Sequence, residues 1–572
     1  MTDKIIRGSG GPPPSPPSPT RAPDTLNSRQ FATIQDLLSE GEIEGFATPS
    51  KAGLTKGTTA YNNAALKDIF LNDTPILNST ASNTNPQTAD FNFQNVGFTP
   101  RFGTSNQEHI PGIESSQSTT AVGVTVTNSS PVTRQITNTN VDAAKVTITF
   151  PQLQKATDQG DLLGSSVQLK IQVQYNSGGF SDVLSDTITG RTADAYQKEY
   201  RVNITGAFPV DIRVVRVTAD STSSSLVDAF AWTSIGEIID DKQRYLNSAY
   251  TNLRIDSEQF SSIPKRAFRI RGVKVRIPAS NGGLTPTVDS QTGRIIYPSN
   301  YIFNGTMGAA AWCSCPAMIL LDLLTTERYG FGTHITDNNL DLFSFVAASR
   351  YANELVSDGF GGQEARFSCN VNLQGSMEAY QLINELAGVM RCFPIWSEGS
   401  VTISQDRPTD PSYLFSLANV GEGGFSYSGS SLKQRHTVIS VSYFNMDSRE
   451  IDYEVVEDTA AQAKLGIVKK DVKAFACTSR GQAQRLGKAI LFSEQNESEV
   501  ISFTTSIDAG AIVRPGSVIS VNDPVRGGER RSGRINAATT TQITVDNTQD
   551  LDTFTGTNKK CSVILPDGTV ET

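Results

Sequence analysis

The sequence predicts a mainly β, multidomain protein, in which a β-sandwich and other β-rich domains accompany one small α+β domain. Its 572 residues correspond to about four domains at roughly 150 residues each. Hydrophobic residues make up only 37% of the chain. This value, with abundant Gly, Ser, Thr and Asn, is typical of β-rich domains with many turns. Long stretches also alternate apolar and polar residues with a period of two, which predicts half-buried strands.

Residues 1–28 form an arm that is rich in proline. Proline fixes φ and lacks an amide donor, so the arm favours extended polyproline II and disfavours helix. We expect it to be either disordered or extended, for example as a strap on a neighbouring subunit. A PxxP signalling ligand is an alternative, although low complexity alone is weak evidence for one.

Residues 29–84 are expected to start a folded domain. Four apolar residues near its beginning have helical spacing and predict a helix that ends at Gly41; they are Phe31, Ile34, Leu37 and Leu38. The run 69–76 is typical of a strand followed by a turn.

Residues 85–225 have the pattern of an inserted β-sandwich. Apolar residues alternate with polar ones over 146–150 and 167–175, and nearly so over 210–217. Turn residues such as those at 176–179 separate these runs, and several short strands with turn signals indicate a sandwich.

Residues 226–300 are expected to form a further β segment. Its clearest run, 268–277, changes phase at Gly272, where a bulge is expected. With that bulge, four basic side chains would share one face: Arg269, Arg271, Lys274 and Arg276. Four charges make only a small phosphate-binding patch, so a solvated strand face, or one paired with a neighbour's carboxylates, is the favoured interpretation.

Residues 301–410 predict a small α+β domain. A buried helix starts at Pro316 and ends near 328–330, and a second helix covers about 339–355. A third helix is expected to be capped by Ser376 with Glu378 in its first turn. Its buried face would comprise Tyr380, Ile383, Leu386 and Ala387. The predicted strands of this domain cover 366–371, 392–396 and 401–403.

Residues 411–572 return to a β-rich pattern, which we expect to be incomplete at the C-terminal end. We expect the turn at Asp567-Gly568 to have no closing strand. One helix is predicted to start at Ser479, with Gln482 completing a capping box, and to reach about Phe492. The predicted strands cover 437–444, 451–456, 500–505, 517–521 and 542–545.

Charge and hydropathy exclude several classes of protein. The net charge is −9, so free nucleic acid is a poor partner, because phosphate binding needs a concentrated basic face. No stretch of about 20 apolar residues predicts a membrane span. Residues 1–11 lack the apolar core of a signal peptide. The chain is therefore expected to stay in the cytosol unless it leaves within a larger particle.

The six cysteines are expected to be free thiols that pack as small apolar groups. Only Cys313-Ser314-Cys315 is closely spaced, whereas a zinc site usually needs two such pairs or a pair with nearby histidines. The three histidines, His109, His334 and His436, are scattered. We therefore expect neither a metal site nor a cofactor.

No catalytic constellation is evident, and we expect no catalytic residue. The sequence lacks a Gly-x-Ser-x-Gly elbow and a phosphate-binding loop. Its tandem carboxylates, Asp240-Asp241 and Glu457-Asp458, are expected at solvated strand ends, because neighbours in a strand point to opposite faces. Stacking of sugars on Trp232, Trp312 or Trp396 is an alternative, although tryptophan is more often a core residue.

Four groups of segments together resemble a known family. They are 37–45 with 69–75; 250–260 with 269–272; 311–330 with 358–362 and 390–408; and 456–458 with 474–483. In this order they are similar to the tip attachment protein J family of lambda-like long-tailed phages, also called the host specificity protein. The resemblance covers nearly the whole chain from about residue 30, and the arm and residues 80–130 match poorly.

The resemblance implies a non-enzymatic siphovirus tail-tip protein. Three chains would form the central hub, a homotrimer at the distal end of the virion's tail, with β-barrels continuing the tube and the sandwich decorating them. The implied partners are the distal tail proteins and the tape-measure protein. Host-receptor binding would lie beyond residue 572. Assembly would occur in the host cytoplasm, and DNA would pass through the channel without specific binding.

Two other functions remain open at this point. The sandwich at 85–225 would suit a carbohydrate-binding adhesin, since β-sandwiches often bind sugars, although a fold does not give a function. Two carboxylates distant in sequence would suffice for a glycosidase that degrades the cell envelope.

Overall fold

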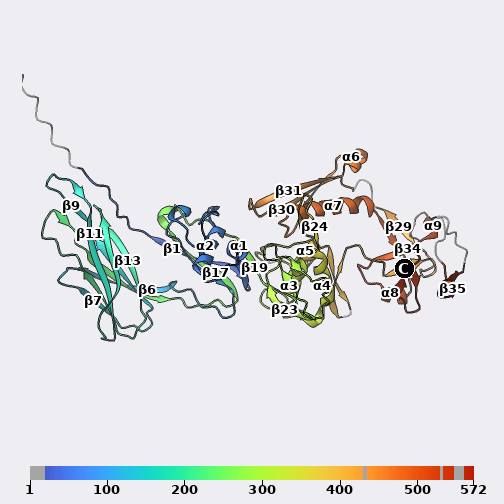
Figure 1. Ribbon diagram of the computed structural model, residues 1–572, viewed down its shortest axis with the longest axis horizontal. Coiled ribbons are helices and arrows are strands. Elements are labelled where there is room, and N and C mark those ends of the chain that lie inside the picture. Colours follow the sequence, from blue (N-terminus) through green and yellow to red (C-terminus); the bar gives the residue numbers. More distant parts are fainter. Residues whose placement is uncertain (1–19, 376, 398, 430–434, 528–532, 547–559) are drawn as a thin grey trace, which may run out of the picture. The chain divides into compact units, whose positions relative to one another are not determined.

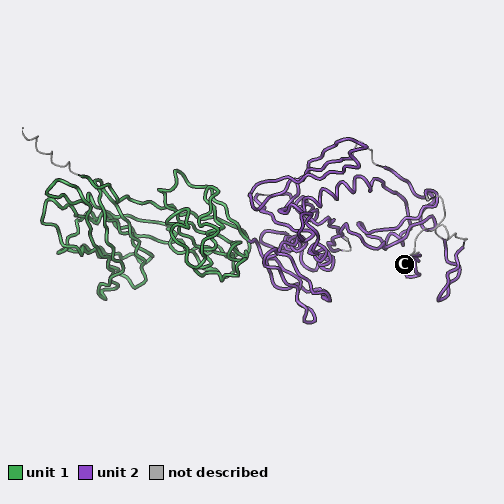
Figure 2. The backbone as a smooth tube through the Cα atoms, turned by 45° about the horizontal axis from the view of Figure 1, so that its top comes forward, with its two compact units in different colours: residues 1–270 green, residues 271–572 purple. Residues whose placement is uncertain are grey.

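The computed structural model describes residues 20–375, 377–397, 399–429, 435–527, 533–546 and 560–572. The chain divides into two compact units, which meet in sequence between Ile270 and Arg271 (Figure 2). Strands outnumber helices in both units and form many separate sheets. The predicted mainly β, multidomain class is therefore confirmed. Within the described residues, no helix is long and apolar enough to cross a membrane.

A two-sheet sandwich forms the larger core of the first unit (Figure 1). One antiparallel sheet has the order β12-β11-β14-β7 and the other the order β13-β8-β16-β6. The first consists of β7 (Val132–Ile136), β11 (Ser165–Tyr175), β12 (Ser181–Gly190) and β14 (Val210–Arg216). The second consists of β6 (Glu114–Thr125), β8 (Ala143–Phe150), β13 (Tyr196–Asn203) and β16 (Ala231–Asp240).

Alternation along the strands explains how the sandwich forms. On β11, Val167, Leu169, Ile171 and Val173 are fully buried, while the residues between them face outward. Successive side chains of a strand point to opposite faces, so these apolar residues meet the inner face of the other sheet. Trp232 on β16 lies in the same core. The alternating strands predicted at 146–150, 167–175 and 210–217 are confirmed up to Arg216.

A buried ion pair closes one end of the sandwich core. The Arg216 side chain is 1% exposed, and its Nη2 lies 2.7 Å from Oδ2 of Asp228, itself 6% exposed. Nη1 donates to the backbone oxygen of Asp228 at 2.7 Å, and Nε donates to the backbone oxygen of Thr218 at 2.9 Å. Buried charge is tolerated only when it is paired and hydrogen-bonded, which this guanidinium achieves.

The described part of the arm lies along the chain's own sandwich. Ala22 N donates to the Leu162 backbone oxygen at 2.9 Å, and Leu162 N donates back to Thr20 at 3.0 Å. Arg191 Nη1 lies 2.6 Å from Oδ1 of Asp24, and Leu26 packs against the sandwich core. Residues 20–28 are thus extended and bound to the sandwich of their own chain. Residues 1–19 lie outside the described residues.

A second sheet of this unit shows that the helix predicted near Phe31 is wrong. The sheet has the order β1-β17-β5, with β1 (Phe31–Glu40), β5 (Gly97–Phe102) and β17 (Ser248–Asp256). Along β1 the exposure alternates with a period of two, and Leu37 is 63% exposed. Pairing with β17 overrides the local helical spacing, because strand formation depends strongly on tertiary context.

The same sheet carries both ends of the segment that contains the sandwich. Phe102, the last residue of β5, pairs with Ala249 at the start of β17. The intervening chain therefore leaves and re-enters the sheet at neighbouring positions.

The α+β part of the second unit has three helices around one core. They are α3 (Pro316–Thr325), α4 (Leu342–Ala352) and α5 (Ala379–Val389), joined by the hairpin of β26 (Cys392–Ser397) and β27 (Ser400–Gln405). Pro316 starts α3 as predicted, but the helix ends at Thr325, before 328–330. The strand predicted at 366–371 is absent, because this segment has no ladder partner.

The third helix begins later than predicted. Glu378 is its N-cap instead of a first-turn residue, and Ser376 lies outside the described residues. Leu386 and Ala387 are buried as predicted, whereas Tyr380 is 73% exposed. The buried face is rotated because Leu382, not Tyr380, enters the core.

The four basic residues near Gly272 do not form the predicted common face. Their segment is divided into β18 (Arg266–Phe268), β19 (Ile270–Val273) and β20 (Val275–Pro278). Arg269 pairs with Asp68 at 2.7 Å and Arg276 with Asp337 at 2.8 Å. The Arg271 guanidinium is buried 4.3 Å from the ring centre of Trp312. Two of the four basic side chains, Arg269 and Arg276, are thus paired with carboxylates of the same chain.

A three-stranded sheet and a long helix follow in the second unit. The sheet order is β31-β30-β32, with β30 (Val438–Asn445), β31 (Glu450–Glu457) and β32 (Lys469–Lys473). Helix α7 (Arg480–Asn496) packs along one face of β30 and β31 (Figure 1). β28 (Tyr413–Ser416), which precedes this sheet in the chain, pairs in parallel with β34 (Ile519–Asn522), which follows α7. The turn at Asp567-Gly568, expected to lack a closing strand, joins the antiparallel strands β37 (Val563–Ile564) and β38 (Val570–Glu571), so that expectation is wrong.

We expect Arg216→Ala to destabilise the sandwich by about 3–5 kcal/mol, because Asp228 would remain buried without its cation. Denaturant unfolding followed by Trp232 fluorescence, with Trp312 and Trp396 replaced by phenylalanine, measures this loss. Arg134→Ala is the control: within the described part of the chain the Arg134 side chain bonds only the Thr133 carbonyl, and a change within about 0.5 kcal/mol is expected. Equal effects of the two substitutions would contradict the role given to the buried pair.

Candidate functional site

The structure places the tandem carboxylates in separate structural roles. Asp240 Oδ2 lies 2.5 Å from Arg201 Nη2, and the Asp240 side chain is only 10% exposed, so the expected solvated end is wrong there. Glu457 is exposed at the end of β31. Asp458 caps helix α6 (Thr459–Leu465) by accepting from Ala461 N at 2.9 Å. None of these contacts joins the two carboxylates of a pair in one site.

The three tryptophans occupy different environments. Trp232 is fully buried in the sandwich, and Trp312 lies beneath the Arg271 guanidinium. Trp396 is 65% exposed on the β26–β27 hairpin. Two of the three are therefore held by packing, as expected of core tryptophans.

Burial makes five of the six cysteines poor nucleophiles. Five of the six are buried free thiols, which confirms their predicted packing, whereas Cys561 is exposed and the prediction is wrong for it. Burial raises the pKa of Cys369 and of Cys392 to about 12, and that of Cys477 to about 11. The thiolate is the reactive form, so these groups stay inert near neutral pH. In the described residues no three potential metal-ligating side chains gather.

The histidines also lie apart. His436 contacts Glu494, with 2.9 Å between Nδ1 and Oε2, and the His109 backbone oxygen accepts from Arg101. His334 N donates to the backbone oxygen of Phe331 at 2.9 Å. No triad-like geometry follows from this arrangement.

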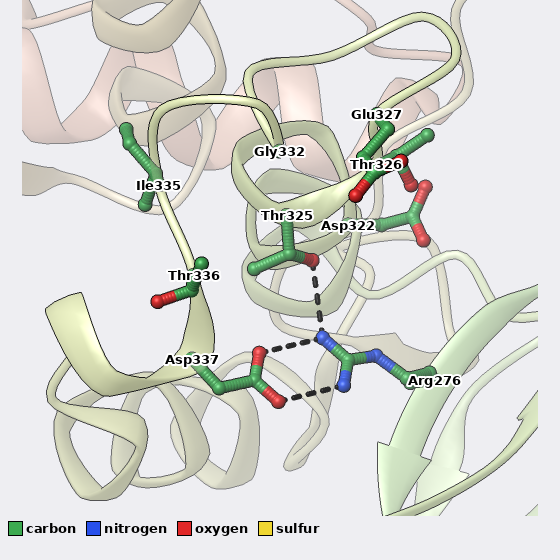
Figure 3. A pocket seen from close by; sticks show the side chains of 9 residues that line it. All are labelled: Arg276, Asp322, Thr325, Thr326, Glu327, Gly332, Ile335, Thr336 and Asp337. Carbon is green, nitrogen blue, oxygen red and sulfur yellow. Dashed lines mark hydrogen bonds and ion pairs between the residues drawn. The ribbon is translucent and has the colours of Figure 1, made fainter.

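A polar pocket of about 390 Å³ lies beside the C-terminal end of α3 (Figure 3). Arg276 spans it and bonds both carboxylate oxygens of Asp337 at 2.8 Å, while Nη2 also donates to Thr325 Oγ1 at 3.1 Å. Burial raises the pKa of Asp322, against the opposing hydrogen bond from Tyr329 at 2.6 Å. The pocket's cation is already neutralised, so the arrangement is suited to a strut between α3 and the following loop.

The more extensive polar contact is one that we name the joint. It connects the turn 358–362 and the hairpin β24 (Leu355–Ser357) and β25 (Gln363–Ala365) to the first turns of α7. Ser479 caps α7 by accepting from Gln482 N at 3.1 Å, and its hydroxyl donates to Glu364. Glu364 also pairs with Arg485 at 2.7 Å. A carboxylate near a helix N-terminus is favoured by the helix dipole.

Gln482 has a different role in the joint from the one predicted. Its side chain does not return to Ser479 as in a capping box. Instead, Oε1 accepts from Ser368 N at 2.9 Å and Nε2 donates to the Ser368 oxygen at 3.1 Å. The side-chain amide of Gln482 is thus hydrogen-bonded by a residue 114 positions away in sequence. No local sequence pattern reveals such a partner. On the other side of the joint, the Arg480 guanidinium lies 4.0 Å from the ring centre of Phe360.

Two glycines permit the close approach of these elements. A Cβ on Gly481 would lie 2.5 Å from Glu364 Oε1 and 2.7 Å from the Asp358 oxygen. Gly359 has a φ of +83°, and a Cβ there would lie 2.3 Å from Gln484 Oε1. Only glycine adopts such a φ without strain, so the joint depends on these positions lacking a side chain.

The sheet β31-β30-β32 presents a second candidate surface, which we name the open face. It is the face opposite α7, and on β31 it carries Ile451, Tyr453 and Val455, which are 62%, 63% and 52% exposed. The intervening Glu454 is 7% exposed and pairs with Arg480 at 2.7 Å. The strand therefore turns apolar side chains toward solvent and a charged one toward α7. The sequence pattern predicted this strand, but it did not reveal that the apolar side chains face solvent and Glu454 is buried.

Comparison with known proteins identifies the family. The family model described as tip attachment protein J, FNIII-A domain, matches residues 116–241, and the model described as putative phage tail protein matches residues 378–538. Tip attachment protein J of Escherichia phage SECphi27 is 30% identical over 526 residues, which cover 91% of this chain. The chain belongs to the tip attachment protein J family. The resemblance noted in the sequence is thereby confirmed.

The tip attachment protein J of Escherichia phage SECphi4 is also 30% identical, over 99% of this chain. The chain covers 41% and 47% of the lengths of these two relatives, so it spans less than half of each. The 43 kDa tail protein of prophage MuSo2 from Shewanella oneidensis is 10% identical, over 69% of this chain and 90% of that one, with a TM-score of 0.23. A score this low carries no functional argument.

The joint brings together two of the segments on which the resemblance to the tip attachment protein J family rests. The turn 358–362 belongs to the third group and 474–483 to the fourth. In the structure their residues touch, as Gly481 and Asp358 show. Their residue types therefore have a physical explanation in the packing of one domain on another.

We expect Gly481→Ala to loosen the joint and to destabilise it by about 1–3 kcal/mol, because the new methyl group would collide with Glu364 and Asp358. Hydrogen exchange of the 355–365 hairpin measures the effect. Gly388→Ala in α5 is the matched control, since a Cβ there meets nothing within 4 Å. That control should gain up to about 1 kcal/mol from helix propensity. Unchanged protection of the hairpin in the Gly481 variant would contradict the joint.

The Arg276–Asp337 pair predicts an acid-dependent stability. The hydrogen bond from Arg276 holds the pKa of Asp337 below its ordinary 3.8. The stabilisation is therefore present above about pH 4 and is lost as pH falls through the lower folded pKa. We expect Asp337→Asn to flatten the fall in unfolding free energy between about pH 4 and 2. Asp410→Asn, at an exposed carboxylate, should leave the slope unchanged; an equal flattening would refute the assignment.

Proposed function

We propose that this chain is a structural subunit of a bacteriophage tail tip. Three copies form a hub that closes the end of the tail tube, with the distal tail proteins above and the tape-measure protein inside. The observation that carries the proposal is the 30% identity to two tip attachment proteins J over 91% and 99% of the chain.

The arrangement of side chains supports a mechanical role over a catalytic one. Charged residues in the described structure are engaged in struts such as Arg216–Asp228, Arg276–Asp337 and Glu364–Arg485. Such pairs fix geometry, and breaking the buried pair Arg216–Asp228 would leave a buried charge at a cost of several kcal/mol. A part that transmits force between host contact and the tail tube needs domains held in this way.

The same hub takes part in host attachment and DNA delivery. In the longer relatives more than half of the chain lies outside the matched part, and we assign receptor contact to the corresponding region beyond residue 572. The net charge of −9 suits a channel through which DNA slides without sticking, since like charge disfavours adhesion. The protein would be assembled in the host cytoplasm and carried at the distal end of the virion's tail.

Labelling of virions tests this proposal directly. Gold-labelled antibodies against the chain should bind the distal end of the tail in electron micrographs. Phages with the gene disrupted should yield particles that lack a complete tail tip, and a plasmid copy should restore it. Label on the capsid, or normal infectious tails without the protein, would overturn the proposal.

A further inference from the structure

Both outer strands of the β31-β30-β32 sheet have an unpaired edge within the described residues. β31 pairs with β30 in antiparallel register, and β32 pairs with β30 in parallel. Neither strand has a described partner on its other side. An open strand edge presents a row of backbone donors and acceptors, so it is either protected or used to bind another strand.

The β31 edge is apolar on the side away from α7. Ile451, Tyr453 and Val455 lie in a row, and each is more than half exposed. Phe444 on β30 pairs with Ile451 and is 42% exposed. Exposed apolar groups that lie side by side on a soluble protein often mark a contact surface.

The two edges carry opposite charge. β31 contains the carboxylates Glu450, Asp452, Glu454 and Glu457 and no cation. β32 contains three lysines and one aspartate in the sequence KKDVK. Glu450, Glu457 and Lys473 are exposed and have no ion-pair partner among the described residues. Charge of one sign on an edge strand disfavours pairing with another strand. Charge of opposite sign on the two edges makes them complementary to each other.

We propose that the β31 edge of one copy of this chain binds the β32 edge of a second copy, and that this contact assembles the hub. The inference rests on the proposed structural function. Because each copy has one acidic and one basic edge, the contact is head-to-tail, and repeating it generates a closed ring when the rotation permits. The neighbouring copy covers Ile451, Tyr453 and Val455, and the outer lysines and carboxylates pair across the boundary.

Charge reversal on each edge, alone and together, tests the contact. The variants of the 572-residue chain are Glu450→Lys with Glu457→Lys, Lys469→Glu with Lys473→Glu, and all four changes combined. Their masses are measured by light scattering over a concentration series, and thermal melting confirms that each is folded. The unaltered chain should associate, each double variant should associate at least about tenfold more weakly, and the fourfold variant should recover.

A substitution in the apolar row of β31 provides an independent test. Tyr453→Glu should also weaken association, whereas Val183→Glu should not, because Val183 is a comparably exposed strand residue (46%) in the sandwich. The contact is overturned if the unaltered chain is monomeric throughout, or if the fourfold variant stays as weak as the doubles. It is also overturned if only an added tail protein, and never a second copy, occupies the β31 edge.

The outcomes for this contact and for the proposed function are separable. Virions from phages that carry each variant can be labelled as described above. Tail tips that contain the monomeric chain would reject the edge contact and leave the structural function standing. Absence of the unaltered chain from the tail would reject both.

Discussion

The pairing of Glu364 with the first turns of α7 is the constraint on which the second unit depends. Two separate hydrophobic cores lie on either side of it, one around α3 and one under α7. The carboxylate receives the Ser479 hydroxyl and the Arg485 guanidinium at the positive end of a helix. Gln482 and Ser368 add a reciprocal pair of bonds beside it. Each bond contributes little alone, but together they leave one relative position for the two cores.

The same use of charge recurs through the chain. Arg266 bonds both oxygens of Asp36, Arg269 pairs with Asp68, and Arg216 is held by Asp228. Arginine suits this role because its planar fork meets a carboxylate at two points. Because these three guanidinium groups are engaged internally, they are not available to bind phosphate.

The sequence predicted those features that depend on local chemistry. The alternating strands of the sandwich, the start of α3 at Pro316 and the Ser479 cap all follow from patterns within a few residues. The helix expected near Phe31 failed because pairing with the distant β17 overrides the local helical spacing. The joint was beyond reach for the same reason, since Gln482 finds its partner 114 residues away. The order of the four groups of segments indicated the family, which no local pattern could do.

The adjacency of Phe102 and Ala249 has a consequence for how such a protein can diversify. The chain enters and leaves the sandwich at neighbouring positions of one sheet. With respect to that sheet, the sandwich is therefore equivalent to a single long loop between β5 and β17. Loop length changes closure entropy only slowly, and insertions whose ends are close are well tolerated. The sandwich can thus be enlarged, exchanged or lost while the β5–β17 ladder stays in register. Relatives that share the β1-β17-β5 sheet are then free to vary the sandwich independently of that sheet.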